Sequence, residues 1–281
     1  MVKQNVEKSY EKHHESGSQL SDNEILTNLK EMHDAESENQ QKYAKFELFM
    51  KPKDKWLTVG DHFGVEARLL EKKDVIATAS DICTVYLSVA KQQKLINDFA
   101  EQNAENMTFE AESFDFVFCR DSYHHFPRPY IAVYEMLRVA KKAVIIDEPL
   151  DPLLKMPLLM FLCNIIDTQR HPLRSTSFWK NRFSFETVGN YVYKCSPREF
   201  EKLSMGMGLP AIAFFYSNTA NTVVNCKEKS HFIRKFLSAC HIIPYTTITT
   251  VLFKTMPSDN EKQKMRHKGW FFYEFPKNPY L

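Results

Sequence analysis

The sequence of 281 residues predicts an α/β domain whose mostly parallel sheet is covered by helices on both faces. Between residues 55 and 150, short apolar segments alternate with segments of helical periodicity. The connections between these segments are short, as is typical of strand–helix–strand units. The strand candidates are continuous apolar runs, which indicates strands that are buried on both faces of a parallel sheet.

Six segments rich in apolar and β-branched residues are predicted to be strands. Gly60 closes the first of them, and the acidic pair Asp147 and Glu148 follows the fourth. In chain order, the predicted strands are residues 56–59, 75–78, 114–119, 143–146, 211–216 and 246–254.

Helices are predicted between these strands and ahead of the first one. Ser21 and Glu24 form a capping-box pattern that starts an N-terminal helix. A second polar helix is predicted to run towards Met50, before Pro52 breaks the pattern. Later helices are predicted at residues 65–70, 84–96, 131–139, 197–203 and 229–240.

The predicted organisation is one α/β domain with additions at both ends. Residues 1–50 are expected to form a helical cap, and residues 51–258 the α/β domain itself. An insertion at residues 150–195 is expected to form a lid over the substrate. The tail, residues 259–281, is too aromatic to stay free in water, so it packs on its own domain or forms a homodimer contact.

Charge and composition restrict the possible partners and compartments. The 37 basic and 35 acidic residues give a net charge of +2, which argues against a nucleic-acid partner. The longest apolar run, residues 153–166, is too short for a membrane span, and the N-terminus lacks a secretory apolar stretch. The six cysteines lack zinc-type spacing. We therefore expect a soluble, cytoplasmic protein with reduced thiols and no metal.

The turn after the first strand contains two glycines four residues apart. Gly60 and Gly64 enclose Asp61 and His62 at the start of the next predicted helix. Glycines let the backbone approach a ligand closely, and the free N–H groups of a helix N-terminus favour an anionic group. A plain strand-to-helix turn explains the same glycines equally well.

An acidic residue follows the second strand. Asp81, with Ile82 beside it, stands 17 residues beyond Gly64. A carboxylate at this strand end can accept hydrogen bonds from both hydroxyls of a ribose. The alternative is a cap for the next helix. Farther along, Asn103 and Ala104 could border an adenine ring, or could belong to an ordinary polar loop.

The loop after residues 114–119 carries most of the candidate chemistry. Ligands of open parallel sheets sit at the carboxyl ends of strands, where this loop is predicted to lie. Histidine titrates near neutrality and suits general-base catalysis, although either histidine could instead cap a helix or pack under a ligand. The candidates in this loop are Arg120, Asp121, Tyr123, His124 and His125.

Taken together, these segments resemble the class I S-adenosylmethionine-dependent methyltransferases. The resemblance covers residues 55–150 and, more weakly, 196–254, and it is greatest to the small-molecule branch with quinone, sugar and natural-product enzymes. The motifs that carry it are WLTVGDHFG, VIATASDIC, NAENMTFEAESFDFVF and SYHHFPRPYIAVYEMLRVAKKAVIIDEP.

The resemblance implies a Rossmann-like fold with a seven-stranded sheet, in which the last strand is antiparallel, and S-adenosylmethionine as cofactor. It places the glycine turn and Arg120 at the methionine part and Asp81 at the ribose. Asn103 and Ala104 would border the adenine. The expected cofactor-binding residues are Gly60, Asp61, His62, Gly64, Asp81, Ile82, Asn103, Ala104, Arg120 and Asp121.

Two departures from the family pattern leave an alternative open. Thr58 stands where the family usually has an acidic residue, and His62 stands where it usually has a glycine. A degenerate, non-catalytic relative that serves as a binding or scaffold subunit would tolerate both changes.

The function expected from these residues is methyl transfer to a small-molecule acceptor, most plausibly to an oxygen. Such an acceptor has to be deprotonated, and His125 is the first candidate for the base, followed by His124. Tyr123 and Glu148 are expected to contact the substrate. No spacing of carboxylates and imidazoles here demands a metal.

Overall fold

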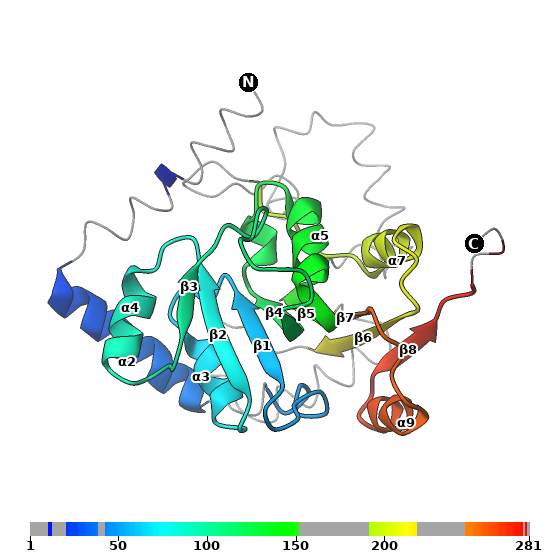
Figure 1. Ribbon diagram of the computed structural model, residues 1–281, viewed down its shortest axis with the longest axis horizontal. Coiled ribbons are helices and arrows are strands. Elements are labelled where there is room, and N and C mark those ends of the chain that lie inside the picture. Colours follow the sequence, from blue (N-terminus) through cyan, green and yellow to red (C-terminus); the bar gives the residue numbers. More distant parts are fainter. Residues whose placement is uncertain are drawn as a thin grey trace.

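The computed structural model describes residues 11–12, 21–38, 43–151, 191–217, 245–277 and 279. Most of the predicted insertion and the whole predicted helix 229–240 lie outside these residues. The six predicted strands are all present, with two additional short ones, one between the second and third and one after the last (Figure 1). The strands are β1 (Lys55–Val59), β2 (Ile76–Asp81), β3 (Phe99–Glu101), β4 (Phe114–Arg120), β5 (Ala140–Pro149), β6 (Ala211–Ser217), β7 (Thr247–Phe253) and β8 (Phe271–Glu274).

The strands form one sheet in the order β3-β2-β1-β4-β5-β7-β6-β8. Strands β1 to β5 pair in parallel, and β7 lies antiparallel between β5 and β6. This confirms the Rossmann-like sheet with an antiparallel seventh strand. An eighth strand, β8, extends the sheet by antiparallel pairing with β6. The order reverses between β1 and β4, and ligands of open α/β sheets bind at the carboxyl ends of strands beside such a point.

Helices cover both faces of the sheet, as expected (Figure 1). On one face, α5 (Pro129–Val139) and α7 (Pro197–Gly206) pack on residues such as Val117 and Ile146. The other face buries Trp56 and Phe118, because successive strand side chains point to opposite faces. Its helices are α2 (Asp22–Glu38), α3 (Val65–Glu71), α4 (Val85–Gln92) and α9 (Asp259–His267).

The segment before β1 is not the second helix that the sequence predicted. Among the described residues, 43–49 form successive tight turns, in which the N–H of Phe46 donates to the carbonyl of Tyr43 and that of Phe49 to Phe46. Two aromatic rings pack the segment against the domain. The ring centre of Phe46 lies 4.8 Å from that of Phe118, and the ring of Phe49 meets Trp270 edge to face, with ring centres 5.4 Å apart. Packing therefore overrides helical periodicity here.

The aromatic tail packs on its own domain. Three side chains of the tail, Met265, Trp270 and Phe272, are buried against the face of the sheet that also carries α3. The sequence signal for α9 is a capping box, in which the Ser258 and Glu261 side chains bond each other's backbone N–H groups. No helix within the described ranges is long and apolar enough to cross a membrane.

Candidate active site

The register of the sheet aligns the ends of three neighbouring strands. Val59 of β1 pairs with Cys119 of β4, which pairs with Ile146 of β5. The next residues, Gly60, Arg120 and Asp147, therefore meet at the carboxyl edge beside the point where the strand order reverses. This is the edge at which the sequence placed its candidate residues.

Both glycines of the first turn have left-handed backbones, which explains why glycine stands there. Gly60 has φ +70° and Gly64 φ +72°. A Cβ on Gly60 would lie 2.5 Å from the Cβ of Ser122, whose hydroxyl donates a 2.8 Å hydrogen bond to the Gly60 carbonyl. The close approach at Gly60 is therefore made by the loop after β4.

Asp61 supplies the buried carboxylate that the Thr58 position lacks. The Thr58 hydroxyl donates to Asp61 Oδ2 at 2.8 Å, and the Ala67 N–H donates to the same oxygen at 2.9 Å. Asp61 is 3% exposed, so its carboxylate satisfies the start of α3 from inside the protein. The sequence assigned Asp61 to cofactor binding, and its carboxylate here contacts Thr58 of β1 and the first turn of α3.

Asp81 ends β2 with its carboxylate partly available. Its Oδ1 accepts the Cys83 N–H at 2.8 Å and lies 3.5 Å from His62 Nδ1. Among the described residues its Oδ2 makes no hydrogen bond or ion pair. The His62 ring packs beside Tyr86 and Phe63, with both ring centres 4.9 Å away. Ile82 lies half-buried next to Asp81.

The predicted adenine loop is fixed by a hydrogen bond within the loop and by an ion pair with the residue before α5. Asn103 Oδ1 accepts the Glu105 N–H at 2.9 Å, and Ala104 is 9% exposed. The Glu105 carboxylate binds Arg128, the residue before α5. The loop therefore has a fixed shape next to the strand ends.

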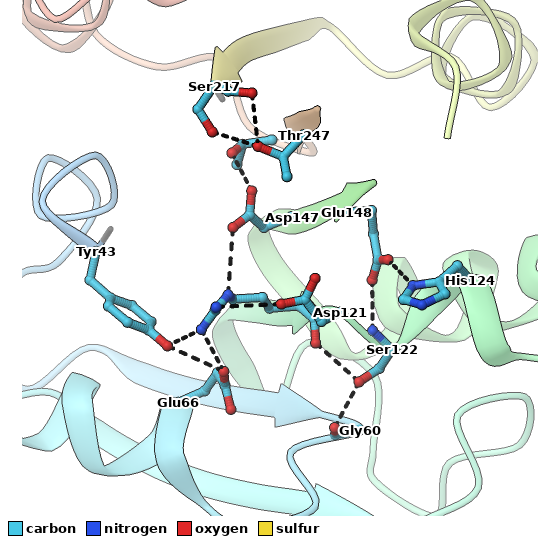
Figure 2. A network of polar contacts seen from close by, with 12 residues as sticks. Tyr43, Gly60, Glu66, Asp121, Ser122, His124, Asp147, Glu148, Ser217 and Thr247 are labelled. Carbon is cyan, nitrogen blue, oxygen red and sulfur yellow. Dashed lines mark hydrogen bonds and ion pairs between the residues drawn. The ribbon is translucent and has the colours of Figure 1, made fainter. Parts of the chain in front are cut away.

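Arg120 is the centre of a buried polar network (Figure 2). Its side chain is 5% exposed, and its Nη1 donates to the Tyr43 hydroxyl and, at 3.0 Å, to Glu66 Oε1. Its guanidinium also lies 3.4 Å from Asp121 Oδ2 and 3.7 Å from Asp147 Oδ2. The sequence identified Arg120 but not its partners.

A second buried cation completes this network. Lys45 Nζ lies 2.7 Å from Asp147 Oδ1, and the Thr249 hydroxyl donates to the same oxygen at 2.6 Å. Burial lowers the pKa of Lys45, while Asp147 opposes that change. Burial and the neighbouring Asp61 raise the pKa of Glu66 well above its usual value. For Glu66, burial and the adjacent Asp61 therefore outweigh the nearby Arg120, which favours the ionised carboxylate.

Asp121 is the network's titrating group, and it predicts how stability depends on pH. Burial raises its pKa to about 7, with Glu148, Asp147 and Glu66 adding to the rise and Arg120 opposing it. The folded state therefore holds a proton that the unfolded chain releases near its ordinary pKa of about 4. This contribution to stability is complete below about pH 4 and is lost as pH rises towards 7 and beyond.

Asp121→Asn is expected to raise the melting temperature at pH 8 and to reduce its fall between pH 5 and pH 8, because the amide does not ionise. Asparagine tolerates the left-handed backbone of this position, where φ is +50°. Thermal melting across this pH range measures the effect. Asp98→Asn, at an exposed ion pair with Lys91, is the matched control. Parallel pH profiles of wild type and Asp121→Asn would contradict the assignment.

His124, the second candidate from the sequence, has the carboxylate partner that a general base needs. Its Nδ1 lies 2.5 Å from Glu148 Oε2. The other oxygen, Oε1, accepts the N–H group of Ser122 at 2.8 Å (Figure 2). It also accepts the N–H group of Tyr123 at 2.8 Å. Glu148 is buried, and Tyr123 packs inside the protein against Phe200. The His125 ring lies 3.8 Å from that of His124.

The structure thus brings together several residues that the sequence predicted separately. Gly60, Arg120, His124 and Glu148 come from three strand ends, and Ser122, which the sequence did not single out, links Gly60 to Glu148. Within the described ranges, no group of three or more His, Cys, Asp and Glu side chains could hold a metal ion.

Comparison with known proteins agrees with this geometry. Residues 57–146 match the sequence model of a family described as a methyltransferase domain. No curated relative matches the chain.

Solved structures share the fold at low sequence identity. A putative methyltransferase of Haloferax volcanii, solved in complex with the Trm112 methyltransferase activator, has a TM-score of 0.55 at 13% identity over 82% of this chain and 94% of its own. An S-adenosylmethionine-dependent methyltransferase of Archaeoglobus fulgidus has a TM-score of 0.51 at 10% identity, covering 78% of this chain and 94% of its own. The YcgJ protein of Bacillus subtilis has a TM-score of 0.50 at 16% identity, covering 78% and 100%.

The family match spans β1 to β5, the strands whose carboxyl ends carry the glycine turn, Asp81 and the His124–Glu148 pair. Residues 57–146 of the chain therefore form a methyltransferase domain.

Proposed function

We propose that the protein transfers a methyl group from S-adenosylmethionine to an oxygen of a small-molecule acceptor, with His124 as the general base. The observation that carries this proposal is the 2.5 Å contact between His124 Nδ1 and the buried Glu148 carboxylate, at the edge where Gly60 and Arg120 meet. A carboxylate on one ring nitrogen fixes the tautomer and leaves the other nitrogen, Nε2, to accept a proton.

The reaction requires one proton transfer and one displacement. When bound beside Gly60 and Asp81, S-adenosylmethionine would supply a methyl group on a sulfonium, whose sulfur would depart as a neutral thioether when the acceptor oxygen takes the methyl group. His124 Nε2 accepts the proton of the acceptor hydroxyl and so frees the oxygen electron pair for that bond. Glu148 stabilises the resulting imidazolium, while two backbone N–H groups hold Glu148 in place. The rest of the rate enhancement comes from holding the two reactants in line.

The residues of the first two strand ends fit the cofactor. The Asp81 side chain is 13% exposed, and among the described residues its Oδ2 makes no hydrogen bond or ion pair, so it can accept hydrogen bonds from ribose hydroxyls. His62 packs against Tyr86 beside this carboxylate. Its contact with Asp81 uses Oδ1, which leaves the second oxygen for a ligand.

Asp81→Asn is expected to weaken binding of S-adenosylhomocysteine by roughly 10-fold to 100-fold, because hydrogen bonds to a charged acceptor contribute about 1.5–3 kcal/mol. Calorimetric titration of the purified protein measures this change. Asp74→Asn is the control, because Asp74 is an exposed aspartate two residues before the other end of the same strand. The affinity of this variant should equal that of wild type.

Two results would contradict the proposal in different ways. A folded wild-type protein that binds neither S-adenosylmethionine nor S-adenosylhomocysteine would support a non-catalytic scaffold. Equal affinity in Asp81→Asn and Asp74→Asn would remove Asp81 from the cofactor site. If binding is found, release of S-adenosylhomocysteine in the presence of hydroxylated small molecules would identify the acceptor.

A further inference from the structure

Two sets of polar contacts join the loop at residues 102–109 to helix α5 and the residue before it: an ion pair at Arg128, and hydrogen bonds from a Glu135–Arg138 pair within the helix. At the first, the Glu105 carboxylate accepts the backbone N–H of Arg128 at 2.7 Å and its Nε–H at 2.6 Å, with Nη2 also 2.6 Å away. At the second, Glu135 accepts the Met107 N–H at 2.9 Å and lies 2.8 Å from Arg138. Arg138 in turn donates to the carbonyl of Met107 at 2.9 Å.

The two attachment points differ in what lies next to them. Arg128 is the residue before α5 and follows His125 by three positions. Arg138 is in the last turn of the same helix, roughly 15 Å farther along it at 1.5 Å per residue. Only the first attachment is therefore adjacent to the turn that carries His124 and His125.

The carboxylate of the first attachment is the more deeply buried of the two. The Glu105 side chain is 1% exposed, whereas the Glu135 side chain at the second attachment is 20% exposed. A buried carboxylate that loses its cation is strongly disfavoured, so Glu105 and Arg128 must move together or separate at considerable cost. A displacement of the loop at Glu105 is thus passed on to the backbone just after the histidines.

We infer that the Glu105–Arg128 ion pair is a positioning contact that couples the adenine side of the cofactor site to the turn bearing His124. This inference rests on the proposed function, because Asn103 and Ala104 of the same loop are the residues expected at the adenine. Ligand binding at the loop fixes Glu105, Glu105 fixes Arg128, and Arg128 limits the movement of the histidine turn. Glu105 and Arg128 act through this turn and are not catalytic residues.

The matched pair of variants Arg128→Met and Arg138→Met tests the coupling. Each removes one positive charge and the side-chain contacts of one arginine with the same loop: Arg128→Met removes the ion pair with Glu105, and Arg138→Met removes hydrogen bonds to the carbonyls of Phe109 and Met107. The readout is amide hydrogen exchange at His125 and Phe126, whose N–H groups donate to the carbonyls of Ser122 and Tyr123. Without ligand, Arg128→Met is expected to speed this exchange by about fivefold or more, and Arg138→Met by less than about twofold.

A second measurement uses S-adenosylhomocysteine as the probe. Both variants are expected to bind it about threefold to tenfold more weakly than wild type, because both loosen the loop. In wild type and Arg138→Met, saturating ligand should slow exchange at His125 and Phe126. In Arg128→Met this slowing should be absent, and Arg128→Lys should restore part of it because its ammonium can still pair with Glu105.

The outcomes separate this inference from the proposed function. A wild-type protein that does not bind S-adenosylhomocysteine overturns the proposed function, and with it the cofactor end of the coupling. If wild type binds but Arg128→Met and Arg138→Met give the same exchange at His125 and Phe126, the positioning role alone is overturned. Thermal melting of each variant confirms that the compared samples are folded.

Discussion

His124→Ala is expected to lower kcat by about 10²-fold to 10⁴-fold, the usual contribution of a positioned general base. Its affinity for S-adenosylhomocysteine should stay close to that of wild type, because the ring contacts Glu148 and His125. Turnover on the acceptor found by screening, measured beside calorimetric affinity, separates the two effects. Glu148→Gln should also lower kcat, since the amide can still accept the N–H groups of Ser122 and Tyr123 but carries no charge for the imidazolium.

His125→Ala is the matched control for this prediction. It removes the neighbouring imidazole, 3.8 Å from that of His124, and leaves the Glu148 contact intact. We expect it to retain turnover within about tenfold of wild type. Undiminished turnover in His124→Ala, or a larger loss in His125→Ala, would assign the proton transfer to a different residue.

Arg120→Met is expected to lower the free energy of unfolding by about 3–5 kcal/mol, because it leaves buried carboxyl groups without their cation. The affected groups are Glu66, Asp121 and Asp147, which surround a guanidinium that is only 5% exposed. A loss of this size corresponds to roughly 10 °C in the melting temperature of a protein of this length. Thermal and urea melting measure it.

Two further variants make this prediction specific to the network. Arg198→Met breaks an exposed ion pair with Glu201 and should change stability by less than about 1 kcal/mol. Adding Glu66→Gln to Arg120→Met removes one stranded carboxyl group and should recover part of the loss. If the double variant is no more stable than Arg120→Met, Glu66 does not share its charge with Arg120 in the way the 3.0 Å contact indicates.

The elements that sequence predicted correctly are those with strong local signals. The strands at 56–59, 114–119 and 143–146 are apolar runs that fill a buried sheet, and each is present. The three residues of β3 are too few to give a pattern. The charged helix α9 lacks an apolar stripe, although Ser258 and Glu261 carried a capping signal that was available. The segment at 43–49 failed because its conformation depends on partners such as Phe118 and Trp270.

The sequence predicted only those residues of the candidate site that stand at the ends of predicted strands. Gly60, Asp81 and Arg120 each directly follow or end a strand, so the sheet itself brings them to one edge. Tyr43 and Lys45 reach that edge from a segment whose path no local pattern specifies. Glu66 looked like an ordinary helix residue, because nothing in the sequence reports that its carboxylate is buried beside Arg120.

The contact between Phe49 and Trp270 can form only late during translation. Trp270 follows Phe49 by more than 200 residues, so the ring that supports this segment leaves the ribosome long after β1 has been made. Lys51 and Glu261, 2.8 Å apart, add a second link across the same interval. Contacts of such long sequence separation form late and slowly. Tyr43 and Lys45 thus gain their final support only when the last strand of the sheet has been synthesised, and a nascent chain that stalls before β8 carries an unfinished site.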